Sequence, residues 1–265
     1  MPGSTLKTHL RRTALVLAMA TGLALGSGST LAAGSVDPEA DKILREMSAY
    51  LSGLAAFSVL GDVDDEVIDL EGQKLQLSSA ASLVVERPGR IYSHRQGPLA
   101  DIEAFFDGST VTLHGKRLGA YVVLPVEGSI DEGITELRAK TDLGFPGADL
   151  FYADPYSGLM SDVTSGAYLG TAFVQGTEVH HLAYRARRVD WQLWIKTGAE
   201  PLPMKYVITS KWLTGAPEYS VRFRDWNTAP AIEPSQFQFS APDGTTQVEF
   251  LSPDDLGTVR IEEVR

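Results

Sequence analysis

From Phe57 onward, apolar and polar residues alternate in short runs, and this pattern constrains the fold more than any other feature of the chain. Alternation with a period of two is typical of strands that bury one face. Turn residues separate the runs, as at 71–73 and 175–177. Connections this short join antiparallel strands, because a parallel crossover needs a much longer segment. We predict about eleven strands in two meanders, 57–126 and 167–226.

The later strands sort their side chains onto two faces. Val189, Trp191, Leu193 and Ile195 share one face, and polar residues occupy the other. One apolar face and one polar face are typical of an antiparallel sheet that is covered on one side only. We therefore expect a mainly β fold with helices (α+β), built on a single curved antiparallel sheet.

Two helical regions interrupt the strand pattern. Asp37 can cap a helix and Pro38 suits its first position, so we predict a helix over 38–52 that Gly53 ends. The segment 130–163 is a helical insertion rich in apolar side chains. So many apolar residues cannot form a solvated loop, and we expect this insertion to cover part of the sheet.

Residues 1–33 have the pattern of a secretory signal peptide. A basic start precedes an apolar run over 13–25, and small residues follow it. A helix needs about 20 residues to cross a bilayer core, so this run is too short for a permanent anchor. A membrane anchor that stays attached is the alternative. We expect cleavage after Ala32 or Ala33, which leaves 34–265 as one domain without a membrane span.

The expected mature chain is strongly acidic and has no cysteine. It carries 20 Lys and Arg against 34 Asp and Glu, a formal net charge of −14. An acidic domain is repelled by nucleic acid and by anionic lipid headgroups, so we expect no nucleic-acid partner. The lack of cysteine excludes a disulfide, a thiolate metal site and a lipoprotein anchor on an N-terminal cysteine.

Two local motifs carry a resemblance to a known superfamily. The first is Asp-Trp-Gln-Leu-Trp-Ile at 190–195, followed after a turn by Pro-Leu-Pro-Met-Lys-Tyr-Val-Ile at 201–208. The second is the closing element over 237–244, with Phe237 and Phe239 before Ala-Pro-x-Gly. Together with the order of helices and meanders, they resemble the lipoprotein carriers LolA and LolB. The chain is most similar to a family of predicted periplasmic proteins known as domain of unknown function 2092.

This resemblance covers roughly the whole mature chain, apart from the tail after Phe250. It implies a half-open β-barrel with helices lying over the mouth as a lid. In the characterised relatives the cavity holds the acyl chains of a lipoprotein. The unknown-function branch offers no catalytic residues to transfer, and the absence of cysteine departs from the membrane-tethered receptors.

A cavity is also expected on physical grounds. The insertion over 130–163 is short relative to about eleven strands, and an apolar hollow that it leaves unfilled could bind an apolar ligand. The alternative is an ordinary filled core made by the same residues. The candidate lining residues from the sheet and the lid are Leu77, Leu83, Val85, Phe151, Leu159, Met160, Trp191, Leu193, Tyr206 and Phe223.

The polar residues give no pattern for a metal or a cofactor, and we expect neither. His180 and His181 are adjacent, so on a strand they point to opposite faces. His94 and His114 fall on separate predicted strands. The acidic run 62–66 lacks the glycine and the distant glutamate of a calcium loop, and its alternate acids favour an outer sheet face.

Catalysis has little support in the sequence. No G-x-S-x-G element is present, and the inward positions that can be assigned are apolar. Arg185, Arg187 and Arg188 form a small basic cluster, which fits a hairpin turn better than a contact for an acidic partner or a lipid phosphate.

The sequence therefore favours a periplasmic, non-enzymatic binding or carrier protein that holds an acyl chain, a lipoprotein or another apolar ligand under a helical lid. The alternative is a structural or regulatory envelope module with a filled core, which acts through an envelope protein partner. An enzyme acting on an envelope polymer is the least supported class.

Overall fold

The computed structural model describes residues 34–69, 71–98, 100–141 and 144–252. The predicted signal peptide and its cleavage position lie outside the described residues. The first described helix is α1, Pro38–Gly53. The Asp37 carboxylate accepts a hydrogen bond from the backbone N–H of Glu39 at 2.9 Å, which caps the helix as the sequence predicts.

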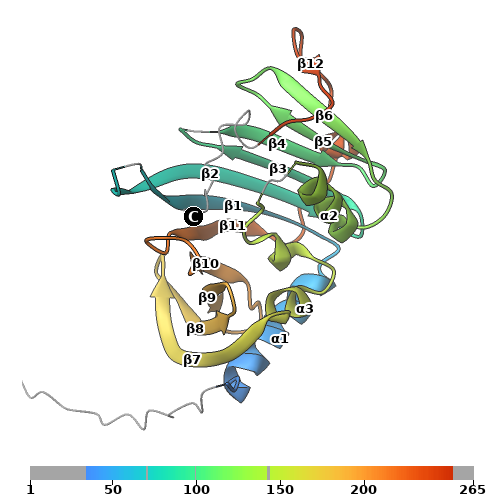
Figure 1. Cartoon of the computed structure of the whole chain (residues 1–265). Helices are drawn as coiled ribbons and strands as arrows, with labels where there is room; N and C mark the ends of the chain where they lie inside the picture. Colours follow the sequence, from blue (N-terminus) through green and yellow to red (C-terminus); the bar gives the residue numbers. More distant parts are fainter. Residues whose placement is uncertain (1–33, 70, 99, 142–143, 253–265) are drawn as a thin grey trace, which may run out of the picture. The chain divides into compact units, whose positions relative to one another are not determined.

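The described strands form one open sheet in the order β12-β6-β5-β4-β3-β2-β1-β11-β10-β9-β8-β7 (Figure 1). All neighbours are antiparallel except β12 and β6, which are parallel. The bounds are β1 Ala56–Ile68, β2 Lys74–Glu86, β3 Arg90–Gln96, β4 Asp101–Phe106, β5 Thr110–Gly115, β6 Ala120–Pro125, β7 Val163–Val174, β8 Thr177–Ala186, β9 Val189–Lys196, β10 Pro203–Ser210, β11 Glu218–Asn227 and β12 Thr246–Gln247.

The two meanders meet along β1 and β11, which are far apart in the sequence. Gly61 pairs with Phe223, and Val63 pairs with Val221. This pairing makes a single sheet out of the two predicted meanders. The predicted mainly β fold, with an open antiparallel sheet and an N-terminal helix, is confirmed, and the strand count rises from about eleven to twelve.

Helices cover one face of this sheet (Figure 1). The predicted insertion consists of α2 Ile130–Thr141, the short 3₁₀ helix η1 Ala148–Phe151 and α3 Pro155–Met160. We call this insertion, 130–160, the lid. The lid and α1 both pack against the apolar face of the sheet.

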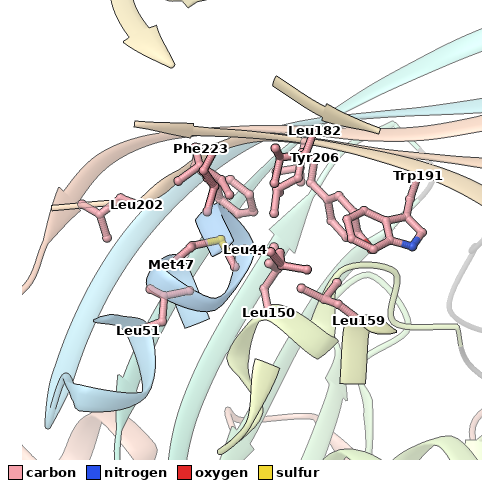
Figure 2. Packing of buried hydrophobic residues seen from close by; sticks show 14 of the residues in the cluster. Leu44, Met47, Leu51, Leu150, Leu159, Leu182, Trp191, Leu202, Tyr206 and Phe223 are labelled. Atoms are coloured by element: carbon pink, nitrogen blue, oxygen red, sulfur yellow. The ribbon is translucent and has the colours of Figure 1, made fainter. Parts of the chain in front are cut away.

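Over β8 to β10 this covered face is filled by side chains, and Phe223 of β11 joins the same cluster. Figure 2 shows leucines and a methionine of α1 and two leucines of the lid pointing at aromatic residues of the sheet. Tyr184 and Trp191 stack with ring centroids 4.1 Å apart, and Trp191 meets Tyr206 edge-on at 5.9 Å. Large side chains in such contact leave a solid core.

The opposite face of the sheet is polar around β1 and β11. Asp64 pairs with Arg222 at 3.1 Å, and Glu66 pairs with Lys74 at 2.8 Å. The alternate acids of the run 62–66 therefore lie on the outer face, as predicted. Asp65 has the other parity and points to the covered face.

The C-terminal segment crosses the outer face and then closes one edge of the sheet. It forms the 3₁₀ helix η2, Pro234–Phe237, after which the Phe239 ring packs on Tyr121 at 4.8 Å. β12 then pairs with β6, and the buried Leu251 joins the apolar cluster on the inner face. The predicted closing element, 237–244, therefore leads directly to the short strand that covers the edge of β6.

Candidate functional site: an apolar cavity under the lid

The covered face is hollow over the first meander. A cavity of about 240 Å³ lies between α2 and the segment 144–151 on one side and β1 to β5 with β11 on the other. Its walls are mostly apolar. The residues that line it include Gly61, Ala81, Leu83, Ser93, Arg95, Ile102, Ala104, Phe106, Ile134, Phe151, Tyr219, Val221 and Phe223.

Small residues on the sheet create this hollow. Directly paired residues on neighbouring antiparallel strands point to the same face, so they form rows across the sheet. One row is Val59, Leu83, Ser93, Ala104 and Leu113, and the next is Gly61, Ala81, Arg95 and Ile102. The small side chains are Ser93 and Ala104 inside the first row, and Gly61 and Ala81 at the start of the second.

The roof of the cavity comes closest to the sheet at Gly133. Gly133 of α2 lies against Phe106 of β4, and a Cβ at residue 133 would be 3.1 Å from the Phe106 ring. Ile134 and Leu137 also line the roof. The helix thus packs on Phe106, and the described side chains of the lid leave a cavity over the smaller residues of the sheet.

A charged pair marks one end of the cavity. Arg95 of β3 donates a hydrogen bond from Nε to the Ser79 hydroxyl at 3.0 Å, and its Nη2 donates to the Asp65 carboxylate. Tyr219 is the direct cross-strand partner of Asp65 and lines the cavity as well. Burial raises the pKa of Tyr219, so its hydroxyl stays protonated and can act as a donor.

The lid is attached to α1 and to itself by polar contacts. The Tyr156 hydroxyl bonds to Asp41 and accepts from Arg45 Nη2 at 2.6 Å. Arg138 Nη1 donates to the Tyr152 hydroxyl at 2.6 Å, and its Nη2 donates to the Phe145 carbonyl at 3.1 Å. These bonds cross from α2 to the segment that follows it, and they hold the lid together as one unit.

Three of the predicted lining residues border the cavity: Leu83, Phe151 and Phe223. The other seven lie elsewhere. Leu159, Trp191, Leu193 and Tyr206 are buried in the filled core, and Met160 packs against it. Val85 is buried beside Phe57 and Ile130, and Leu77 lies on β2 closer to the β1–β2 turn. A ligand contact at any of the ten stays a prediction.

Sequence reasoning missed most of the cavity floor. It did not select Ile91, Ser93, Arg95, Ile102, Ala104 or Leu113. A usable signal was present, because Ala81, Ser93 and Ala104 are small residues at inward positions of three consecutive strands. A hollow forms where inward residues are small, whereas most of the residues predicted from the sequence are large and apolar.

The histidines of the sheet have ordinary partners. His94 Nε2 lies 2.7 Å from Asp101, and His114 Nδ1 lies 3.1 Å from Glu103. His180 contacts the Tyr168 hydroxyl at 3.0 Å, and His181 contacts Gln192 at 2.9 Å. Within the described ranges, no group of three or more His, Cys, Asp or Glu side chains is placed to hold a metal ion.

The remaining surface features are plain. The basic cluster lies at the β8–β9 turn, as predicted, and the Arg188 guanidinium lies over the Trp212 ring at 4.6 Å. None of the described helices combines the length and the apolar composition that a membrane span requires.

Several solved structures resemble this chain at low identity. An uncharacterized conserved protein from Thermus thermophilus is 12% identical, with a TM-score of 0.47, and the match covers 79% of this chain and 98% of that one. LprF from Mycobacterium bovis is 17% identical, with a TM-score of 0.45 and coverage of 80% and 100%. A LolA superfamily protein from Nitrosomonas europaea is 9% identical, with a TM-score of 0.38 and coverage of 76% and 97%.

No curated protein matches the chain. One protein-family model does match, over residues 40–251. That range runs from α1 to Leu251, so it includes the whole sheet, the lid and every wall of the cavity. The chain therefore belongs to the family described as predicted periplasmic protein (DUF2092).

Proposed function

We propose that this protein is a periplasmic, non-enzymatic binding protein that holds one apolar chain in the cavity under the lid. The observation that carries the proposal is a mostly apolar hollow of about 240 Å³. Small-molecule sites are roughly 300–1,000 Å³ and are mostly apolar with a few polar groups. This cavity is slightly smaller than that range, which favours a single acyl chain over a multi-chain lipid.

Binding rather than catalysis fits the polar groups that are present. A catalytic serine needs an adjacent base that accepts its proton. Ser82 and Ser93 line the cavity, and neither bonds to a histidine or a carboxylate within the described part of the chain. The Arg95–Asp65 pair is an ion pair at one end of the cavity, and the Ser79 hydroxyl beside it accepts from Arg95 Nε rather than donating to a base among the described residues.

A periplasmic location is supported by the description of the family and by the predicted signal peptide over 1–33. Removal of that peptide would release 34–265 as a mature carrier. Delivery of an acylated protein, as in the LolA and LolB resemblance, is the most specific form of the proposal. The cavity size supports one acyl chain of such a cargo.

The first test is native mass spectrometry of the mature protein purified from its own periplasm, with lipid extraction of the same sample. We expect a one-to-one complex with an acylated species. A bare protein mass, together with no uptake of a fluorescent fatty acid, would contradict the proposal. It would favour the envelope module that acts through a protein partner.

A matched pair of variants on β2 connects binding to the cavity. Ala81 lines the cavity, whereas its neighbour Ala80 is exposed on the opposite face. Ala81→Leu places extra carbon atoms in the hollow, so we expect it to abolish uptake of the fluorescent fatty acid. Ala80→Leu adds the same atoms outside and should bind like the wild type. Equal uptake by both variants would place the ligand elsewhere.

A further inference from the structure

Arg95 stands out among the residues that face the cavity. Its direct cross-strand partners are Ala81 and Ile102, and both line the apolar wall. A guanidinium in such surroundings needs a partner of opposite charge, since an unpaired charge is costly to bury. Asp65 supplies that charge from β1, across the intervening strand β2.

The ion pair remains accessible from solvent. The Arg95 side chain is 36% exposed, and the Asp65 side chain is 26% exposed. Partly exposed pairs of this kind contribute little net stability, because water competes for both charges. Replacement of the Asp65 carboxylate by a ligand carboxylate as the partner of Arg95 should therefore change the stability of the folded protein little.

Unused donors surround the pair. Only Nε and Nη2 of Arg95 make hydrogen bonds to described residues, so Nη1 is free to donate to a ligand. The Tyr219 hydroxyl is a second donor, on the residue directly paired with Asp65. A planar guanidinium matches the two oxygens of a carboxylate better than it matches a single acceptor atom.

From this arrangement we infer that Arg95 binds the carboxylate head of an amphiphile whose chain occupies the cavity, and that this carboxylate displaces Asp65. The inference rests on the proposed function and narrows its single acyl chain to a long-chain carboxylate, that is, a free fatty acid rather than an acylated protein. Asp65 then serves as an internal counter-ion, which neutralises Arg95 when the cavity is empty.

The test compares three probes of equal chain length: a fluorescent fatty acid, its methyl ester and the corresponding alcohol. The wild type should bind the acid about tenfold more tightly than the two neutral probes, as a charge-assisted hydrogen bond predicts. In Arg95→Gln the affinity for the acid should fall to that for the ester, while the affinity for the ester stays the same.

Asp65→Asn gives the sharpest outcome. Removal of the competing carboxylate should tighten binding of the acid several-fold and leave the ester unaffected. A purely structural role of the ion pair predicts the opposite, namely weaker binding of all three probes. Weaker binding of the acid by Asp65→Asn, or equal losses for acid and ester in Arg95→Gln, would overturn the inference.

The outer face of the same strands supplies the control. Asp64 and Arg222 form an ion pair at 3.1 Å on that face, so Asp64→Asn and Arg222→Gln change equivalent charges away from the cavity. Both should bind all three probes like the wild type. If the wild type binds none of the probes, the proposed function itself fails. If the wild type binds acid and ester equally, the proposed binding of an apolar chain in the cavity is retained, and the proposed role of Arg95 is rejected.

Discussion

Gly133 of α2 lies so close to Phe106 of β4 that a Cβ at position 133 would be 3.1 Å from Cδ1 of the ring. Both residues border the cavity, and both are buried. The contact brings α2 close to the sheet beside the small residues, together with the buried Ile130 and Leu137 of the same helix. The cavity therefore depends on a glycine at this position as much as on the small residues below it.

Enlargement of this glycine should lift α2 from the sheet. We expect Gly133→Val to destabilise the protein by about 1–3 kcal/mol, the usual cost of overpacking a core. Thermal unfolding followed by circular dichroism measures the effect. Ala139→Val changes an exposed position of the same helix and should cost well under 1 kcal/mol. Equal losses in the two variants would show that α2 does not rest on Phe106.

A larger side chain on the floor of the cavity should stabilise the ligand-free protein and at the same time prevent ligand binding. Ala104 lies in the middle of one row, with Ser93 and Leu113 as its direct partners. We expect Ala104→Leu to raise the Tm of the ligand-free protein, because filling a cavity typically adds about 0.5–2 kcal/mol.

The same variant should lose its response to ligand. A ligand that binds only the folded state raises Tm in proportion to the logarithm of its concentration. The Tm of the wild type should therefore increase with added fatty acid, whereas that of Ala104→Leu should stay constant. A lower Tm without ligand, combined with a normal increase, would mean that residue 104 borders no usable cavity.

The lid should carry a pH-dependent destabilisation at Asp149. Burial raises the pKa of this carboxyl, and Arg138, 4.0 Å away, offsets only part of that effect. A raised pKa in the folded state means that stability is greatest below the unfolded pKa of about 3.9 and is lost as the pH rises through the folded pKa. We therefore expect Asp149→Asn to raise Tm at neutral pH, and the gain to vanish in acid.

Asp154 provides a control of opposite sign. Hydrogen bonds from the Ser157 hydroxyl and backbone N–H lower the pKa of Asp154. The stabilisation that Asp154 contributes is therefore present above its pKa in the unfolded state, and it is lost as the pH falls through its pKa in the folded state. Asp154→Asn should lower Tm at neutral pH, and the loss should shrink on acidification. A change in Tm of the same sign at neutral pH for Asp149→Asn and Asp154→Asn would contradict this account of the lid.

The Tyr156 hydroxyl should control how often the lid opens. It joins α3 to Asp41 and Arg45 of α1. We expect Tyr156→Phe to speed hydrogen exchange at the amides of 155–160 and to shorten the lifetime of the ligand complex, because a link between lid and helix is lost. Tyr50→Phe removes a hydroxyl that makes no hydrogen bond to described residues, and it should change neither rate.

Local features of the sequence predicted most of the fold. The cap at Asp37 and the position of Pro38 located α1 to within a residue of its observed end at Gly53. Alternation located the strands, since the buried residues of β9, Trp191, Leu193 and Ile195, are among those that share a face in the sequence. The pairing of β1 with β11 was not predictable, because it joins residues about 160 positions apart.

The walls of the cavity were predicted less well than the fold, for a physical reason. Trp191 and Tyr206 are large and apolar, and for that reason they fill space against Tyr184. The hollow lies where Ala81 and Ala104 leave room, and an alanine by itself does not indicate a cavity. Arg95 was missed because a charged residue on a strand normally points to solvent, and only its pairing with Ala81 reveals that it faces inward.

The most direct test of the central claim is a crystal structure of the mature protein with a fatty acid brominated near the end of its chain, in which anomalous scattering locates the bromine. We predict a bromine peak inside the cavity, beside Ala104 and Ile134, with the carboxylate at the Arg95 end. A bromine peak outside the cavity, or an empty cavity at saturating ligand, would contradict the account.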